Sequence, residues 1–240
     1  LEKNQGVVCA SAGNHAQGFA YSCHLLGVQG VVFLPQNTPK QKVEQVIYFG
    51  KEHLKVVMEG ENFDQSCLQA QKFAKEKEKI FIHPFDDVDV IAGQGTLALE
   101  MIADFPRKLD ALLVPVGGGG LASGVGIVYK NLSPNTRLIG VEVEGADAMT
   151  QSLNTNIRIK LDSLDTFADG TAVKQVGRLG FEICGSLLDD ILLVNKKTLC
   201  EVMLSLNNQH GMVVEPSGAL ALAALNQLHG GSGRLNVGCV

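Results

Sequence analysis

The 240-residue sequence predicts an α/β fold that contains two open parallel sheets. Short segments rich in valine, isoleucine and leucine alternate along the chain with longer segments in which apolar residues recur at helical spacing. The short segments are continuously apolar, as in strands that helices cover on both faces. Apolar residues make up 45% of the sequence and charged residues 19%, which is the balance of an ordered globular protein.

The first part of the chain predicts four strands and three helices. We expect strands at residues 7–9, 31–34, 54–58 and 80–82. The first helix spans residues 14–26 and ends at Gly27, because glycine readily adopts the left-handed conformation that follows a helix. Thr38 and Pro39 predict the N-cap and first turn of a helix that runs to Phe49. A third helix is expected at residues 62–79 from its apolar periodicity.

The rest of the chain repeats this alternation after a polar, proline-containing loop at residues 83–87. We expect strands at residues 112–116, 138–141, 191–194 and 235–239, and helices at residues 88–103, 121–131, 197–209 and 217–228. Residues 146–188 read as irregular. The loop predicts a boundary between a small domain, residues 6–82, and a large domain, residues 83–240 together with residues 1–5. Because the chain starts at Leu1 and stops within an apolar run, we expect it to be truncated at both ends.

Composition argues against several classes of function. The formal net charge is −5 and the isoelectric point is about 5.7, without a basic cluster, so we expect no binding of nucleic acid or of a membrane surface. No apolar stretch approaches the roughly 20 residues that cross a bilayer, and no signal peptide is visible. Six scattered cysteines lack metal-ligand spacing, which predicts reduced thiols in a cytoplasmic protein and no metal site.

Four consecutive glycines, residues 117–120, lie between an expected strand and the helix that starts at Leu121. Without side chains, several backbone N–H groups can point inward, and the helix N-terminus adds partial positive charge. This pattern predicts a cup for an anion, most naturally a phosphate. The alternative is a plain tight turn, which we disfavour because four glycines cost conformational entropy that a turn does not require.

The identity of the phosphate compound stays open on these residues. Gly117, Gly119 and Ala122 fit the loose dinucleotide-binding pattern, and Glu142 follows at a position suited to a ribose-binding acid. A dinucleotide-binding oxidoreductase is therefore an alternative. A Walker A loop is excluded because no Gly-Lys-Ser/Thr follows the glycines.

A second polar loop, residues 10–18, also joins an expected strand to a helix. Ser11, Asn14 and the first free helical amides could gather a carboxylate or hold a cofactor hydroxyl. Equally, Ser11 or Asn14 could simply cap the helix, and His15 could be an ordinary surface residue. A dinucleotide enzyme gives no reason for two such loops, whereas an enzyme that binds an amino acid and a small phosphorylated cofactor does.

Four motifs occur in order along the chain. They read CASAGNHAQGFAYSC, IHPFDDVDVIAGQGT, VPVGGGGLASGVG and VVEPSGALALAAL. Together they resemble the fold-type-II pyridoxal-phosphate (PLP) enzymes, and most closely the biosynthetic threonine dehydratases, over nearly the whole chain. The resemblance implies two parallel-sheet domains of the tryptophan-synthase-beta-like kind and PLP as the cofactor.

The resemblance also implies roles for individual residues. The phosphate cup of PLP corresponds to Gly117, Gly118, Gly119, Gly120 and Leu121. The loop that receives the substrate carboxylate corresponds to Ser11, Ala12, Gly13, Asn14 and His15. Asn14 matches the residue that hydrogen-bonds the 3′-hydroxyl of the ring, and Glu215 resembles the acidic residue near the ring. An alternative for Glu215 stays open, namely that it is only a glutamate at the start of a helix, next to Pro216.

The implied reaction is the dehydration and deamination of L-threonine to 2-oxobutanoate and ammonia, the first step of isoleucine biosynthesis, with L-serine as a further substrate. The cofactor acts as an electron sink and a lysine removes the Cα proton. We expect a cytoplasmic homo-oligomer that binds a small amino acid.

The chain departs from the family pattern at the catalytic lysine. The Ser-Phe-Lys-x-Arg-Gly-Ala motif that carries the Schiff-base lysine and the Ser-Gly-Gly-Asn motif near the ring nitrogen do not occur in the 240 residues. We therefore expect this fragment to hold much of the cofactor site without turning over threonine, and we assign no catalytic residue within it.

Related enzymes stay as alternatives. Serine racemases carry a serine where this chain has Ala12, and alanine has no proton to give. Their metal motif, Glu-x-x-x-Ala-x-Asp, is matched at Glu142 and Ala146 but not at Ala148. These departures argue against racemisation and against a metal site. A racemase-like or other β-eliminating enzyme, or a non-catalytic amino-acid-binding relative, stays open.

Overall fold

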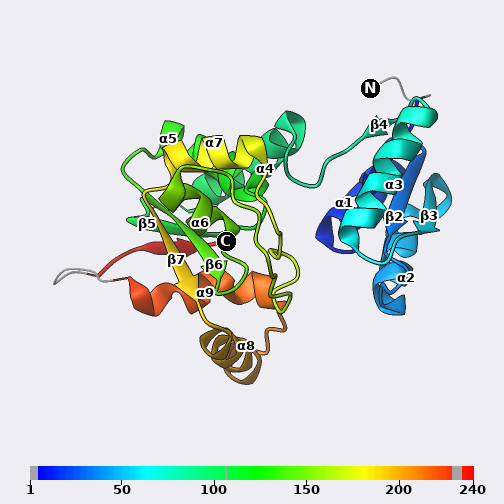
Figure 1. Cartoon of the computed structure of the whole chain (residues 1–240). Helices are drawn as coiled ribbons and strands as arrows, with labels where there is room; N and C mark the ends of the chain where they lie inside the picture. The colour runs from blue at the N-terminus through cyan, green and yellow to red at the C-terminus, as the bar shows by residue number, and fades with distance from the viewer. Residues whose placement is uncertain (1–4, 106, 229–233) are drawn as a thin grey trace. The chain divides into compact units, whose positions relative to one another are not determined.

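The computed structural model describes residues 5–105, 107–228 and 234–240, and the chain divides into two compact units between Pro84 and Phe85 (Figure 1). The sequence placed this boundary between residues 82 and 83. It also assigned residues 1–5 to the large domain. Residues 1–4 lie outside the described residues, and the Gln5 side chain donates a hydrogen bond to the Glu78 carbonyl oxygen of the first unit at 2.8 Å.

The first unit is built on a parallel sheet with the strand order β3-β2-β1-β4. Its elements are β1 (Val7–Ala10), α1 (Asn14–Leu26), β2 (Gly30–Leu34), α2 (Lys40–Gly50), the 3-10 turn η1 (Lys51–His53), β3 (Leu54–Met58), α3 (Phe63–Glu76) and β4 (Ile80–Phe81). Alternate residues of β1 face opposite sides of the sheet. Val7 and Cys9 pack with α1 and α2, whereas Val8 and Ala10 pack with α3.

The second unit is built on a parallel sheet with the order β7-β6-β5-β8. Its elements are α4 (Val88–Asp104), β5 (Ala111–Pro115), α5 (Gly120–Leu132), β6 (Arg137–Val143), α6 (Ala148–Thr155), α7 (Arg178–Leu187), β7 (Asp190–Val194), α8 (Lys196–His210), η2 (Pro216–Ala219), α9 (Leu220–Ala223), η3 (Leu225–Gln227) and β8 (Val237–Cys239).

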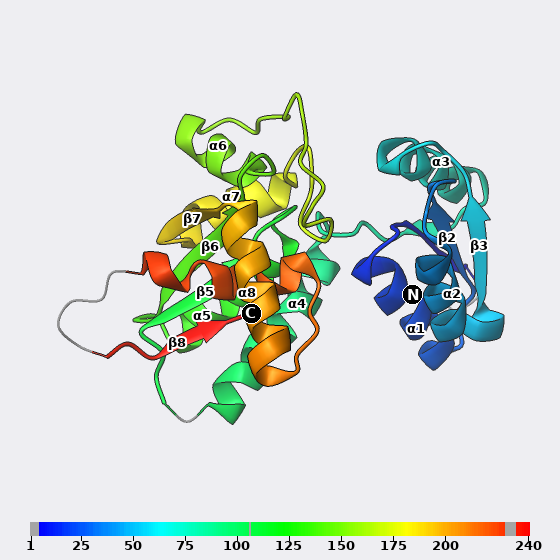
Figure 2. The ribbon, with the colours of Figure 1, turned by 90° about the horizontal axis from the view of Figure 1, so that it is seen from below.

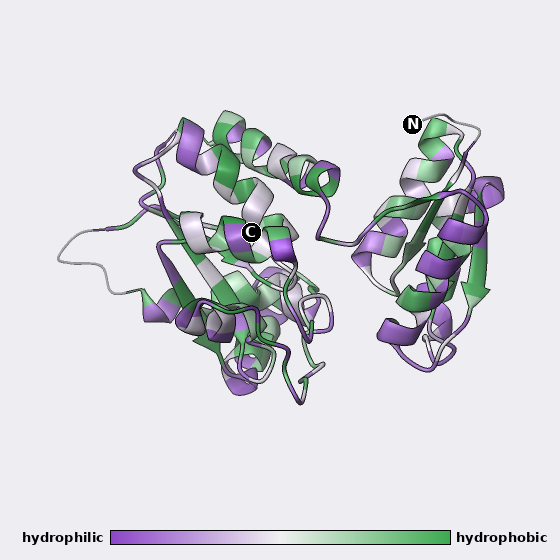
Figure 3. Cartoon of the chain, turned by 45° about the horizontal axis from the view of Figure 1, so that its top comes forward, coloured by the Kyte–Doolittle hydropathy of each residue, from purple (hydrophilic) through white to green (hydrophobic). Residues whose placement is uncertain are grey.

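Helices cover both faces of this second sheet. Leu112 and Val114 of β5 are buried with α4, α5 and α7, and Leu113 is buried on the other face with α8 and α9. Figure 1 shows the first layer above the strands, and Figure 2 shows α8 lying across them from the other side. Apolar residues run along the strands of both units (Figure 3). The predicted fold class, two parallel sheets with helices on both faces of each, is confirmed.

All eight expected strands are present within two residues of their predicted ends, but three other expectations are wrong. Thr38 does not cap α2, because its hydroxyl donates to the Pro35 carbonyl oxygen and Pro39 is the N-cap residue. Residues 217–228 form two 3-10 turns and a short helix, since the amide of Ala224 is shared between two carbonyl oxygens three and four residues earlier. Residues 146–188 are not wholly irregular, because they contain α6 and α7.

No helix within the described ranges combines the length and the apolar character needed to cross a membrane. In parallel sheets, ligands bind beyond the carboxyl ends of the strands. The loops that follow β1 and β5 are therefore the places to search for a site.

Candidate functional site

The glycine loop (residues 117–120) leaves the carboxyl end of β5 and leads directly into α5. Gly119 is the N-cap residue of α5 and has a φ of +95°, in the left-handed region that favours glycine. Gly118, Gly119 and Gly120 are buried. The loop therefore forms a fixed part of the second unit's interior.

Close contacts with the protein itself require glycine throughout this loop. A Cβ atom on the second glycine would overlap the ring of Phe85, and one on the fourth would lie 2.8 Å from the Phe85 carbonyl oxygen. On the first and third glycines, a Cβ atom would lie 2.8 Å from the Thr171 carbonyl oxygen and 2.8 Å from the Gly180 Cα atom. Real Cβ atoms do not approach other atoms so closely, so any larger residue would displace the loop.

The amides of this loop are available for a ligand. Within the described parts of the chain, the backbone N–H groups of Gly118, Gly119, Gly120 and Leu121 have no hydrogen-bond acceptor. Leaving a buried donor unpaired costs about 1–3 kcal/mol, and the N-terminus of α5 adds partial positive charge. The loop therefore offers the free donors and the partial positive charge that an anion such as a phosphate requires.

Two aspartates of the IHPFDD motif organise the helices around the loop. The carboxylate of Asp86 accepts hydrogen bonds from the amides of Arg178 and Leu179 at 2.9 and 2.8 Å, at the start of α7. Asp87 accepts two amides at the start of α4, at 2.8 and 3.1 Å. Both side chains therefore stabilise helix N-termini. Their neighbour Phe85 supports the glycine loop.

A segment that the sequence did not single out, residues 169–171, contacts both this loop and Glu215. A Cβ atom on Gly170 would lie 3.1 Å from Glu215 Oε1 and 2.9 Å from Ser217 Oγ. The Thr171 hydroxyl lies 3.5 Å from Ser217 Oγ, and the Thr171 backbone packs against the first glycine of the loop. Glu215 is exposed and is the N-cap residue of η2, without a side-chain cap hydrogen bond, so the alternative that it heads a helix stays open.

The sequence contains a signal for a turn at residues 169–171, but the signal is easy to overlook. Asp-Gly is a turn dipeptide, and the Thr171 amide and hydroxyl both donate to the Ala168 carbonyl oxygen, at 3.1 and 3.2 Å. Because this turn lies in the stretch that read as irregular, nothing in the sequence linked it to the glycine loop.

In the first unit, the asparagine loop (residues 11–15) connects the carboxyl end of β1 to α1. The hydroxyl oxygen of the buried Ser11 accepts a hydrogen bond from the Gly13 amide at 3.2 Å. Gly13 is the N-cap residue of α1 without a side-chain cap bond, and the exposed Asn14 is the first residue of the helix. The N-cap residue is therefore Gly13 rather than Ser11 or Asn14, and Ser11 satisfies the amide of Gly13 just before the helix. Ala12 packs partly buried against the core.

His15 is held as a neutral ring. Its Nε2 atom lies 3.4 Å from the Ile82 carbonyl oxygen, and its ring centroid lies 6.4 Å from that of Phe19. Burial lowers the pKa of His15 to about 4, although the contact with Ile82 opposes this effect. At neutral pH the imidazole therefore donates a hydrogen bond to a carbonyl group and carries no charge.

Glu142, the acid of the dinucleotide alternative, is fully buried. Its carboxylate accepts hydrogen bonds from the Met149 amide at 2.9 Å, the Thr150 amide at 2.8 Å and the Thr150 hydroxyl at 2.7 Å. Burial raises the pKa of Glu142 to about 7, and these hydrogen bonds oppose the rise. Both carboxylate oxygens anchor α6, so the dinucleotide alternative is wrong in its choice of ribose-binding residue.

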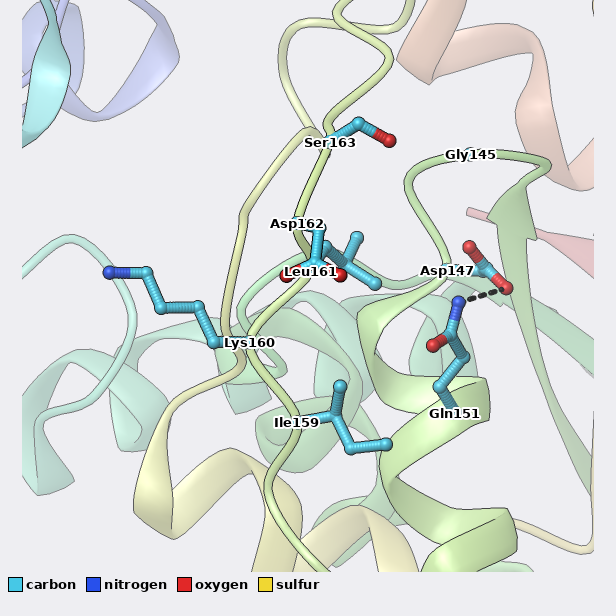
Figure 4. A pocket seen from close by; sticks show the side chains of 8 residues that line it. All are labelled: Gly145, Asp147, Gln151, Ile159, Lys160, Leu161, Asp162 and Ser163. Carbon is cyan, nitrogen blue, oxygen red and sulfur yellow. Dashed lines mark hydrogen bonds between the residues drawn. The ribbon is translucent and has the colours of Figure 1, made fainter.

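A pocket elsewhere in the second unit does not belong to this site. It lies between the loop after β6 and residues 159–163 (Figure 4). The residues that line it are Gly145, Asp147, Gln151, Ile159, Lys160, Leu161, Asp162 and Ser163. None of them belongs to the glycine loop.

The structure therefore groups the predicted site residues into two sets. Residues 117–121 and Glu215 lie in the second unit, joined there by residues 169–171. Residues 11–15 lie in the first unit, where residues 11–13 lead into the first two residues of α1.

Known proteins resemble almost the whole chain. The biosynthetic L-threonine dehydratase of Halalkalibacterium halodurans is 49% identical over 225 residues, which cover 94% of this chain and 54% of that protein. The structure of threonine deaminase isoform 2 from Solanum lycopersicum, in its processed form, is 36% identical with a TM-score of 0.90, covering 98% of this chain and 68% of that one. Maize serine racemase is 31% identical with a TM-score of 0.91, covering 100% and 74%.

The chain spans about half the length of the curated relatives it matches. Residues 1–239 match the family described as pyridoxal-phosphate dependent enzyme. This match covers nearly every residue of both units, and the chain therefore belongs to the family of pyridoxal-phosphate dependent enzymes.

Proposed function

We propose that this chain forms the cofactor- and substrate-binding part of an L-threonine dehydratase. This lyase converts L-threonine to 2-oxobutanoate and ammonia, the entry to isoleucine biosynthesis, and also accepts L-serine. The similarity to biosynthetic threonine dehydratases supports the proposal. The observation that carries it is the set of unpaired, buried amides at the start of α5, which fit the phosphate of PLP.

In this proposal, the second unit holds the cofactor. The amides of residues 117–121 would bind the phosphate, and Glu215 would lie near the pyridine ring. When bound, PLP supplies an electron sink for the bond that breaks at the amino acid's Cα atom. Amide donors on a helix N-terminus suit this ligand because they hold a dianion without a titrating side chain.

The first unit is proposed to receive the substrate. Ser11, Ala12 and Gly13 form a turn whose polar groups suit a carboxylate, and Asn14 would hydrogen-bond the 3′-hydroxyl of the ring. His15 is neutral, so it would contribute a positioned ring rather than a positive charge. Binding of the substrate carboxylate would therefore depend on hydrogen-bond donors of the turn.

In the proposed reaction, the Schiff-base lysine of the family removes the Cα proton, and none of the four motifs of this chain carries that lysine. The family's Schiff-base motif, Ser-Phe-Lys-x-Arg-Gly-Ala, does not occur in the 240 residues. We therefore propose that the chain alone binds the cofactor phosphate but does not turn over threonine. Formation of 2-oxobutanoate by the purified chain with added PLP would contradict this part of the proposal.

Calorimetry with pyridoxine 5′-phosphate and with pyridoxine tests the phosphate cradle. These ligands lack the aldehyde, so they cannot form imines with surface lysines. A charge-assisted hydrogen bond contributes about 1.5–3 kcal/mol, so the phosphate should strengthen binding by at least about tenfold. Equal affinities for the two ligands would refute the assignment of the glycine loop.

A pair of alanine variants localises the binding. Gly118→Ala would direct a methyl group into the Phe85 ring and should abolish the preference for the phosphorylated ligand. Gly93→Ala is the matched control, because Gly93 is exposed on α4 and nothing lies within 4 Å of the added carbon atom. Circular dichroism verifies that each variant is folded. A preference that survives Gly118→Ala places the phosphate elsewhere.

The reaction is tested on the complete protein. We expect 2-oxobutanoate from L-threonine and pyruvate from L-serine. The similarity to maize serine racemase makes racemisation the second candidate. Ala12 argues against it, since an alanine cannot protonate a carbanion. Formation of D-serine from L-serine without 2-oxobutanoate from threonine would favour the racemase.

The proposal places the enzyme in the cytoplasm as a homo-oligomer. All six cysteines are free thiols, which suits a reducing compartment. Light scattering on the complete protein measures its mass in solution, and a monomer would contradict the proposed assembly.

A further inference from the structure

Two histidines and a glutamate meet at the end of α1 opposite to the asparagine loop. His24 lies in the last turn of α1, and Glu52 and His53 lie in η1. Glu52 Oε1 lies 3.9 Å from His24 Nδ1 and 3.4 Å from His53 Nδ1. One ligand atom from each residue lies within 4.8 Å of the others. Three potential metal ligands therefore converge on one small volume.

The two imidazole nitrogens that face this volume are unpaired. His24 Nδ1 and His53 Nδ1 are buried atoms without a hydrogen-bond partner among the described residues. The distances to Glu52 are too long for good hydrogen bonds. An unpaired buried nitrogen costs free energy, so an ion that accepts both lone pairs would remove two such costs.

The charge of the cluster also favours a cation. Glu52 places a carboxylate oxygen 3.9 Å from His24 Nδ1 and 3.4 Å from His53 Nδ1. The cluster lies at the C-terminal end of α1, where the helix carbonyl groups carry partial negative charge.

We propose that His24, Glu52 and His53 form a binding site for a divalent transition-metal ion such as Zn²⁺. Imidazole nitrogen and carboxylate oxygen are ligands that zinc prefers, and two histidines with one glutamate leave a fourth position open to water. Ligand atoms around a tetrahedral zinc ion lie about 3.3 Å apart, given bonds of about 2.0–2.2 Å. The 3.4 Å pair already fits, whereas the 3.9 Å pair would have to move closer and the two nitrogens start within 4.8 Å of each other.

Such an ion would connect the end of α1 to the turn that precedes β3. Sequence spacing gave no indication of this site, because His24 is distant from the other two ligands along the chain. Packing of α1 against η1 brings the three side chains together. The site is independent of the proposed dehydratase function, since none of its residues belongs to the asparagine loop.

Zinc titration of the metal-free chain, in competition with a chromophoric chelator, tests the site. We expect one zinc equivalent per chain and at least a tenfold loss of affinity in each of His24→Gln, His53→Gln and Glu52→Gln, because changes even in the outer shell of zinc sites cost about 10–100-fold. His210→Gln is the matched control, since His210 lies in α8 of the second unit. Cys67→Ser controls for zinc binding by a partly exposed thiol.

A second measurement separates binding from folding. Histidine ¹⁵N resonances should shift for His24 and His53 on addition of zinc, with the His210 resonance unchanged. Glu52 is exposed, so its glutamine variant should stay folded even where a histidine variant does not. Three outcomes would each overturn the proposal. They are equal zinc affinity in the wild type and Glu52→Gln, loss of zinc binding in Cys67→Ser, and no zinc binding by the wild type.

Discussion

Replacing Glu142 with glutamine should flatten the pH dependence of the stability of the second unit. Glu142 is fully buried and holds the start of α6 through three hydrogen bonds. Burial raises the pKa of its carboxyl from an ordinary 4.5 to about 7. Between these values the unfolded chain loses the proton while the folded chain keeps it, so stability falls as the pH rises.

The size of the effect follows from the difference between the two values. They differ by about 2.5 pKa units, and each unit corresponds to about 1.36 kcal/mol, which gives about 3 kcal/mol. This contribution is fully present below pH 4.5 and is lost as the pH rises through about 7. A glutamine has no proton to lose, so its variant should lack this slope. It should also be less stable at acid pH, because its amide nitrogen would face donors of Thr150.

Urea denaturation at about pH 5 and about pH 8 measures the effect. The stability advantage of the wild type over Glu142→Gln should shrink by up to about 3 kcal/mol between these values. Other titrating groups occur in both proteins and cancel in the difference. Glu182→Gln, at an exposed position of α7, is the control and should follow the wild type at both values. Parallel behaviour of wild type and Glu142→Gln would refute the buried, proton-binding carboxylate.

Three further changes probe other contacts. Gly118→Ala should destabilise the second unit by about 2 kcal/mol or more, because the added methyl group overpacks against the Phe85 ring. In urea denaturation, Phe85→Leu in the same chain should restore part of the lost stability. No recovery would contradict the contact. Asp189→Ala removes the acceptor 2.6 Å from the Leu138 amide together with an ion pair, and should cost about 2 kcal/mol in thermal unfolding. Asn62→Ala removes the N-cap of α3 and should cost about 1 kcal/mol, so an unchanged urea midpoint would argue against this cap.

Local signals in the sequence were sufficient for most of the fold. The strands were found because they are short runs rich in valine, isoleucine and leucine, and the central strands β1, β2, β5 and β6 are buried on both faces. Helix α1 was found to the residue because Gly27 ends it in the left-handed conformation, with a φ of +65°. Helices α6 and α7 were missed because carboxylates outside each helix, those of Glu142 and Asp86, bind their first amides. No local pattern reports such a partner.

The candidate site was predictable from the sequence only where its signal is local, as it is for most of the fold. The glycine loop could be found because its signal is contiguous and its chemistry is carried by the backbone. The role of Glu142 could not be found. The sequence around an acid at the end of a strand does not distinguish one that binds a ribose from one that binds a buried helix terminus. The contacts of Phe85 and Thr171 with the glycine loop depend on packing between segments far apart in the sequence.

The contacts of the glycine loop with Phe85, Thr171 and Gly180 have a thermodynamic consequence for any anion that binds there. The donors are pre-organised, so association need not freeze the backbone of four residues, a step that would cost about 1–2 kcal/mol for each. Folding of the second unit has already met that entropic demand. Selectivity among anions then depends on the shape and charge of each anion. A rigid set of donors cannot move to accommodate an anion whose acceptor atoms lie at other positions.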